Sequence, residues 1–139
     1  MTRLLAHLKE EAMSATQPFQ TTVEIKLPSG TEGQNGSFHV PKGKRLVLDF
    51  ASGEAFLPAG QKAVFSVITS LAGQPTGISH YLASTTLGTF GAAEYFGAGQ
   101  IVRLYADPGT VVMLRVDRDA PTGDGLARMS VSGELVAVP

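Results

Sequence analysis

The sequence has 139 residues, no cysteine and a formal net charge of −1 at pH 7. A chain of this length fits one domain with a core large enough to fold without disulfides or metals. The absence of cysteine excludes thiol catalysis, zinc sites built on cysteine and iron–sulfur clusters. The near-neutral charge argues against a nucleic-acid partner, and no apolar run approaches the roughly 18 residues that a membrane span needs.

The first residues differ from the rest. Residues 1–12 carry leucines at helical spacing, but their apolar stretch is too short for a secretory signal. The segment 9–12 (KEEA) before Met13 can be encoded by purine-rich DNA resembling a bacterial ribosome-binding site, so Met13 is a candidate start. We predict a helical or disordered extension over residues 1–18 and one domain over residues 19–139. The missing export signal favours the cytoplasm.

From residue 19 onward, the sequence has the pattern of an all-β protein. Phe19–Leu27 alternates apolar with polar residues, as expected of a strand with one buried face. Glycine- and proline-rich turns separate it from further strand-like runs. These runs are Ser37–Val40, Lys44–Ala51, Gln61–Ser70, Ile78–Leu87, Ile101–Ala106, Val111–Val116 and Leu126–Val138. About eight short strands predict an antiparallel β-sandwich, jelly-roll or Greek-key-like, with a small closed barrel as the alternative.

Several positions carry more specific predictions. The turn Asp107-Pro108-Gly109-Thr110 suits type II geometry, which twists against a tight hairpin. The strands on either side of it should therefore lie in opposite sheets or be joined by a wider loop. In Lys44–Ala51, Leu46, Leu48 and Phe50 should share one face. The segments 28–36, with its Asn-Gly pair, and 52–60 are expected to be loops. The last strand should bend or bulge near Gly133.

The stretch 88–99 (GTFGAAEYFGAG) interleaves four glycines with aromatic residues and has no steady period. A loop of this length in a small domain is usually functional or packed on itself. Its candidate binding residues are Phe90, Glu94, Tyr95 and Phe96. They can plug one end of the sandwich, contact another subunit, or stack on a ligand such as a sugar ring.

Other chemistry has weaker support in the sequence. Asp117, Asp119 and Asp124 resemble a calcium loop, but Pro121 interrupts the order of an EF-hand and a solvated turn is the simpler interpretation. The histidines in the predicted domain, His39 and His80, lack the spacing of a cupin metal site. There is no Gly-x-Ser-x-Gly motif. A catalytic carboxylate pair could come from Asp49, Glu54, Glu94 and Glu134.

These observations favour a non-catalytic sandwich that works by self-association, as a structural or scaffold component, with no cofactor. The low content of charged residues, 17%, leaves a surface that is easily desolvated. The expected edge strands, Phe19–Leu27 and Leu126–Val138, carry few charges to prevent pairing. The first alternative is a carbohydrate- or small-ligand-binding module that uses residues 88–99. The second is a cupin-like or glycosidase-like enzyme.

Overall fold

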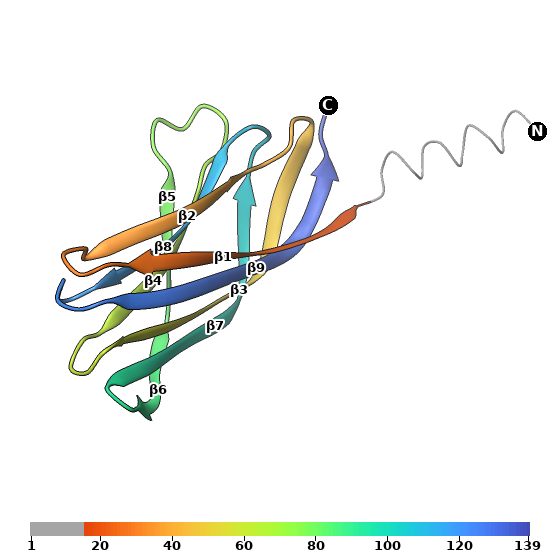
Figure 1. Cartoon of the computed structure of the whole chain (residues 1–139). Coiled ribbons are helices and arrows are strands. Elements are labelled where there is room, and N and C mark those ends of the chain that lie inside the picture. Colours follow the sequence, from red (N-terminus) through yellow and green to blue (C-terminus); the bar gives the residue numbers. More distant parts are fainter. Residues whose placement is uncertain (1–15) are drawn as a thin grey trace, which may run out of the picture.

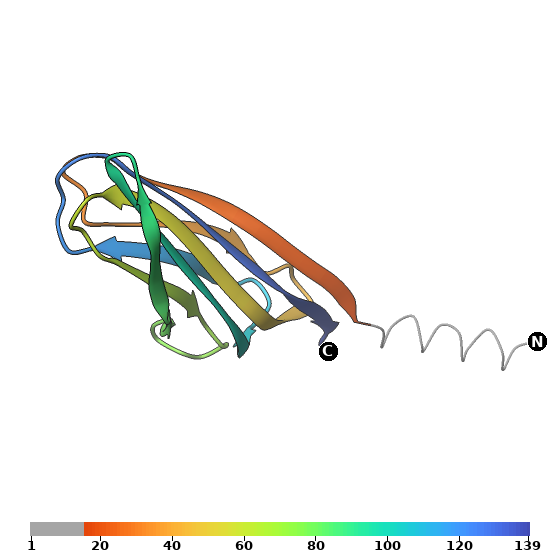
Figure 2. The same ribbon diagram turned by 90° about the horizontal axis from the view of Figure 1, so that it is seen from below.

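The computed structural model describes residues 16–139, which fold as two antiparallel sheets packed face to face (Figures 1 and 2). In spatial order, the five-stranded sheet contains β1 (Gln17–Leu27), β9 (Gly125–Ala137), β3 (Lys44–Pro58), β7 (Ala93–Ala106) and β6 (Ser84–Phe90). The four-stranded sheet contains β2 (Gly33–His39), β8 (Val111–Arg118), β4 (Ala63–Thr69) and β5 (Ile78–Leu82). The predicted β-sandwich is confirmed, and within this part of the chain neither sheet closes into a barrel.

The strands pair in a nested order. β1 pairs with β9, β2 with β8, β3 with β7, and β4 with β5, all antiparallel. Successive pairs belong alternately to the two sheets. This is the arrangement of a jelly roll, in which a long folded ribbon wraps around its own core. β6 is an additional strand that pairs with the outer side of β7.

The core lies between the two inner faces. The alternation in β1 is confirmed, since Ile25 and Leu27 are buried while Glu24 and Lys26 are exposed. β8 contributes three fully buried residues by the same period of two, and β4 contributes Phe65 and Val67. Other core members are Val40, Leu46, Leu48, Ala55, Leu57, Leu82, Phe96, Leu104, Ala127, Met129 and Val131. Apart from Val40, which follows β2, these residues lie on strands in which successive side chains point to opposite faces.

Strand β3 departs from the expected pattern. It continues to Pro58, so the loop expected over residues 52–60 is wrong for most of its length. A β-bulge between Leu48 and Phe50 also reverses the alternation: Phe50 is exposed and Ala51 is buried, opposite to the prediction. A bulge inserts one extra residue, and every later side chain then changes face. The bulge expected near Gly133 exists, but the extra residue is Asp49 of β3, the strand that pairs with β9 at this point.

Two expectations at the edges are also corrected. Asn35 and Gly36 lie inside β2 and form no turn. Gly36 permits a close approach of β1, because a Cβ there would lie 2.9 Å from Cβ of Val23. β9 is an inner strand, between β1 and β3, because the nested pairing returns it beside the first strand. Of the two expected edge strands, only β1 lies at an edge.

The turn at residues 107–110 connects the two sheets, as one of its two predicted arrangements required. β7 belongs to the five-stranded sheet and β8 to the four-stranded sheet. The buried carboxylate of Asp107 accepts hydrogen bonds from the backbone N–H of Ala72 at 2.6 Å and from Nε of Arg45 at 2.7 Å. The backbone N–H of Asp107 donates to the carbonyl of Ser70. One aspartate thus connects three separate segments at this end of the sandwich.

We expect Gly133→Ala to destabilise the fold by about 2 kcal/mol or more, since a Cβ at Gly133 would lie 2.8 Å from Cα of Leu48 and closer still to the carbonyl oxygen of Val47. Backbone atoms on the bulged strand cannot move aside without breaking the ladder. Urea denaturation would measure the loss. Gly99→Ala is the matched control, because its nearest neighbours, at 3.5 Å and beyond, allow a methyl group. Equal stability of the two variants would contradict this account of the bulge.

We expect the stabilising effect of Asp107 to depend on pH. Hydrogen bonds from Ala72 and Arg45 lower the pKa of the Asp107 carboxyl below its ordinary value of 3.8. The folded state therefore favours the charged form, and this stabilisation is complete above about pH 3.8 and is lost as the pH falls through the lower folded pKa. Urea denaturation at several pH values should show Asp107→Asn less stable than wild type at neutral pH, with a difference that narrows in acid. If the difference in stability between Asp107→Asn and wild type stayed constant down to the lowest pH, this role of the charged carboxylate would be contradicted.

Candidate interaction surface

The stretch expected to be a loop, residues 88–99, is a β-hairpin. β6 and β7 pair directly through a tight turn at Gly91 and Ala92. Its irregular sequence has a steric cause. Gly97 leaves room for the side chain of Leu87, since a Cβ there would lie 2.6 Å from Cδ1 of that leucine. The glycines thus accommodate neighbouring side chains within a sheet, and the period of two is hidden from sequence reading.

The hairpin separates the four predicted binding residues. Phe90 is 60% exposed, whereas Phe96 is only 2% exposed and belongs to the core. Phe96 therefore has no free surface to offer a ligand or a subunit, because it lies on the inner face of β7. The carboxylate of Glu94 accepts a hydrogen bond from the backbone N–H of Gly60 at 2.9 Å, which ties the hairpin to a neighbouring turn.

Tyr95 lies on the outer face of the five-stranded sheet. Its ring stacks on Phe56 with a centroid separation of 4.5 Å, and Phe90 meets it edge-on. Its hydroxyl donates a 2.7 Å hydrogen bond to Glu54, which raises the pKa of Tyr95 above its ordinary value and keeps the phenol protonated. Phe90 and Tyr95 are thus brought together in one aromatic cluster.

A single extended segment passes from one sheet to the other beside this cluster. The strand predicted over residues 78–87 is in fact two strands, β5 and β6, joined at Ala83 and running along one side of the molecule (Figure 1). The side chain of Gln100 accepts a hydrogen bond from the backbone N–H of Ala83, and the hydroxyl of Ser84 donates to the carbonyl of Ala63. These bonds give hydrogen-bond partners to the N–H of Ala83 and the C=O of Ala63, at the point where the strand leaves one sheet and joins the other. We call residues 78–90 the crossing strand.

The crossing strand is an edge in both sheets, and it is uncharged. From Ala63 to Ala93 the sequence contains no Asp, Glu, Lys or Arg. Its exposed apolar side chains are Ile78, Tyr81, Leu87 and Phe90. β1, the opposite edge of the five-stranded sheet, carries Glu24 and Lys26. Charged residues on an edge normally discourage pairing with another chain, and the crossing strand lacks this protection.

An open apolar hollow of about 480 Å³ lies next to Phe90. Its lining residues come from the end of β3, the β6–β7 turn and the start of β9. They are Phe56, Leu57, Pro58, Phe90, Ala92, Ala93, Asp124, Gly125 and Leu126. The hollow extends the apolar surface of the crossing strand around the end of the five-stranded sheet.

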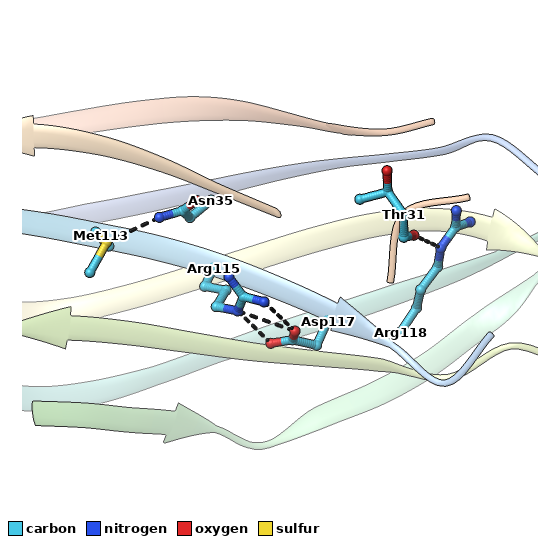
Figure 3. Close-up of polar contacts among 6 residues, drawn as sticks. All are labelled: Thr31, Asn35, Met113, Arg115, Asp117 and Arg118. Carbon is cyan, nitrogen blue, oxygen red and sulfur yellow. Dashed lines mark hydrogen bonds and ion pairs between the residues drawn. The ribbon is translucent and has the colours of Figure 1, made fainter. Parts of the chain in front are cut away.

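The three aspartates considered for calcium are engaged with separate protein groups. Asp117 forms an ion pair with Arg115 at 2.9 Å (Figure 3), Asp119 accepts the backbone N–H of Lys62, and Asp124 accepts that of Ser29. Within residues 16–139, no group of three or more histidine, aspartate or glutamate side chains is arranged to hold a metal ion. Asp119 and Asp124 thus hold loops at one end of the sandwich, whereas Asp117 pairs within β8.

Arg118, which sequence reading did not single out, is a buried cation at the end of β8. Its side chain donates hydrogen bonds to the carbonyl oxygens of Thr31 (Figure 3), Leu27, Pro28 and Pro121, and to the amide oxygen of Gln61. These acceptors come from three separate segments of the chain, near residues 27–31, 61 and 121, so no local motif could have revealed the arrangement.

The two histidines lie far apart in the topology. His39 ends β2 and His80 lies in β5, which are the opposite edges of the four-stranded sheet. Nε2 of His80 is 3.2 Å from the hydroxyl of Thr69, and burial lowers the pKa of His80 below 6.5. Strand pairing therefore does not bring the two histidines together.

Two comparisons of the sequence with known proteins assign it to no family. No protein-family model matches the sequence, and comparison with curated proteins finds no match. Across residues 16–139 there is no helix with the length and apolar character required to cross a membrane.

We expect the two phenylalanines of the hairpin to behave differently when truncated. Phe96→Ala should cost about 3–5 kcal/mol of stability because it leaves a cavity between the sheets. Phe90→Ala removes an exposed ring and should cost less than about 1 kcal/mol in the isolated chain. Urea denaturation of both variants, at a protein concentration low enough to avoid association, would measure the difference. If Phe96→Ala and Phe90→Ala lost similar amounts of stability, the buried position of Phe96 and the exposed position of Phe90 would be contradicted.

Proposed function

We propose that the protein is a non-catalytic β-sandwich that assembles with further copies of itself through the crossing strand. The observation that carries this proposal is an uncharged edge, in both sheets, with exposed apolar side chains. An exposed strand edge offers unpaired backbone N–H and C=O groups to another strand. The occupant that we propose is the crossing strand of a second copy.

β6 offers its backbone for pairing as two short stretches, on either side of a register shift between Thr86 and Gly88. β6 ends the five-stranded sheet, so a second β6 lying antiparallel would continue the same sheet into its partner. Such a pair is related by a two-fold axis, and each copy contributes the same residues. Because β6 has no charged residue, the two-fold arrangement brings no like charges together. If β6 carried Lys or Glu, the two-fold pair would place like charges of the two copies near each other, and their repulsion would oppose pairing.

The side chains add apolar surface to the backbone pairing. Leu87 and Phe90 project from β6 and are 53% and 60% exposed. Burial of such side chains stabilises an interface by about 25 cal/mol per Å² of apolar area removed from water. The apolar hollow beside Phe90 offers a place for a side chain of the partner copy. Its position next to the edge supports a contact that extends beyond the strand pair itself.

We expect light scattering after size exclusion to give the wild-type protein a mass of at least two chains. The double variant Leu87→Lys/Phe90→Lys should elute as a monomer, because charges at a strand edge must be desolvated on pairing. Both side chains are exposed in the isolated sandwich, so the variant should keep its fold, which circular dichroism can check.

Val64→Lys/Val111→Lys is the matched control. Val64 lies on β4 and Val111 on β8, the two inner strands of the other sheet, and they are 44% and 37% exposed. The control adds the same two charges on strands that are not edges and should retain the mass of the wild type. A monomeric wild-type protein, or a double variant that stays associated, would overturn the proposal.

A further inference from the structure

The outer face of the five-stranded sheet contains a shallow trough. One part has a volume of about 540 Å³ and is lined by Gln20, Thr21, Thr22, Phe50, Ser52, Ser130, Val131 and Ser132. A second part, of about 320 Å³, shares Thr22, Ser52 and Ser130 with the first and reaches Tyr95 and Leu87 on the far side. The trough therefore runs across the strands, from β1 towards the β6–β7 hairpin.

Strand register creates the trough. Thr22 lies opposite Ser130, Ser130 opposite Ser52, and Ser52 opposite Gly99, so one row across four strands holds small side chains. Larger residues border this row. Phe50 lies on one side of it, turned outward by the bulge in β3, and the stacked rings of Phe56 and Tyr95 lie on the other.

Polar groups follow the length of the trough. The hydroxyls of Thr22 and Ser130 are 2.7 Å apart and keep further hydrogen-bonding capacity. Beyond this row, Arg128 lies between two carboxylates, 3.9 Å from Glu24 and 3.6 Å from Glu54. The trough thus offers hydroxyl groups that donate and accept, carboxylate acceptors, guanidinium donors and the faces of aromatic rings.

We infer that the trough binds a neutral, linear oligosaccharide. Sugar hydroxyls both donate and accept hydrogen bonds, and the C–H face of a pyranose ring packs against an aromatic ring. The two carboxylates outnumber the one guanidinium, so the site disfavours phosphate and other anions. The row crosses four strands, or roughly 14 Å at about 4.8 Å between strands, which is the length of about three sugar units.

The oligosaccharide site is distinct from the proposed assembly surface, although Leu87 borders both. Phe50, Ser52 and Thr22 lie away from the crossing strand, on β3 and β1. Assembly through β6 would leave this part of the trough open. Phe50→Ala, on an inner strand, should therefore lose the sugar but keep the mass of the wild type, so failure of one proposal can be told from failure of the other.

Isothermal titration calorimetry with neutral linear tetrasaccharides of glucose, xylose, mannose and galactose would test the site. We expect at least one of them to bind the full chain. Phe50→Ala removes the bordering ring and Ser52→Gln fills the floor of the trough; each should weaken binding by about tenfold or more, the equivalent of about 1.4 kcal/mol.

Ser37→Gln is the matched control, since Ser37 is exposed on β2 in the other sheet, and it should bind like the wild type. The inference is overturned if none of the four sugars binds, or if Phe50→Ala and Ser52→Gln bind as tightly as Ser37→Gln. Preferential binding of an anionic tetrasaccharide or of a peptide in the same trough would also overturn it.

Discussion

One end of this sandwich depends on the buried guanidinium of Arg118. Each of its hydrogen bonds ends on an uncharged oxygen, from the β1–β2 connection, the β3–β4 turn or the β8–β9 loop. A buried cation is tolerated only where such acceptors surround it. If one of the three connections moved away, the charge would lose part of its solvation at a cost of several kcal/mol. The position of each connection is therefore linked to the other two.

The opposite end uses a buried carboxylate in the same way. Asp107 binds the backbone of Ala72 and the side chain of Arg45, and its turn also bonds to the backbone of Val40. Between the two ends the sheets meet through apolar side chains, whose attraction is non-directional. Directional hydrogen bonds at both ends limit how far one sheet can slide along the other.

The local pattern of the sequence predicted the fold class well, and its failures have identifiable causes. Period-two alternation was sufficient for Phe19–Leu27, because nothing interrupts that strand. It failed at Phe50, where a bulge depends on the contact with Gly133 of another strand. It failed again over residues 88–99, where glycines accommodate Leu87 and other neighbours. The nested pairing, the inner position of β9 and the acceptors of Arg118 all come from contacts distant in the sequence, which periodicity does not report.

Of the predicted binding residues, Phe90 and Tyr95 share one cluster, and Phe96 belongs to the core. The trough on the outer face, in contrast, depends on the bulge in β3. Without the extra residue in β3, Phe50 would point into the core and Ser52 would share its inward direction, leaving the outer face with Ala51. Because the bulge reverses the alternation, the aromatic ring and the hydroxyl instead face outward beside Ser130. An irregularity that costs regular pairing thus gives the outer face both its hollow and its polar lining, which a regular ladder of this sequence would not have.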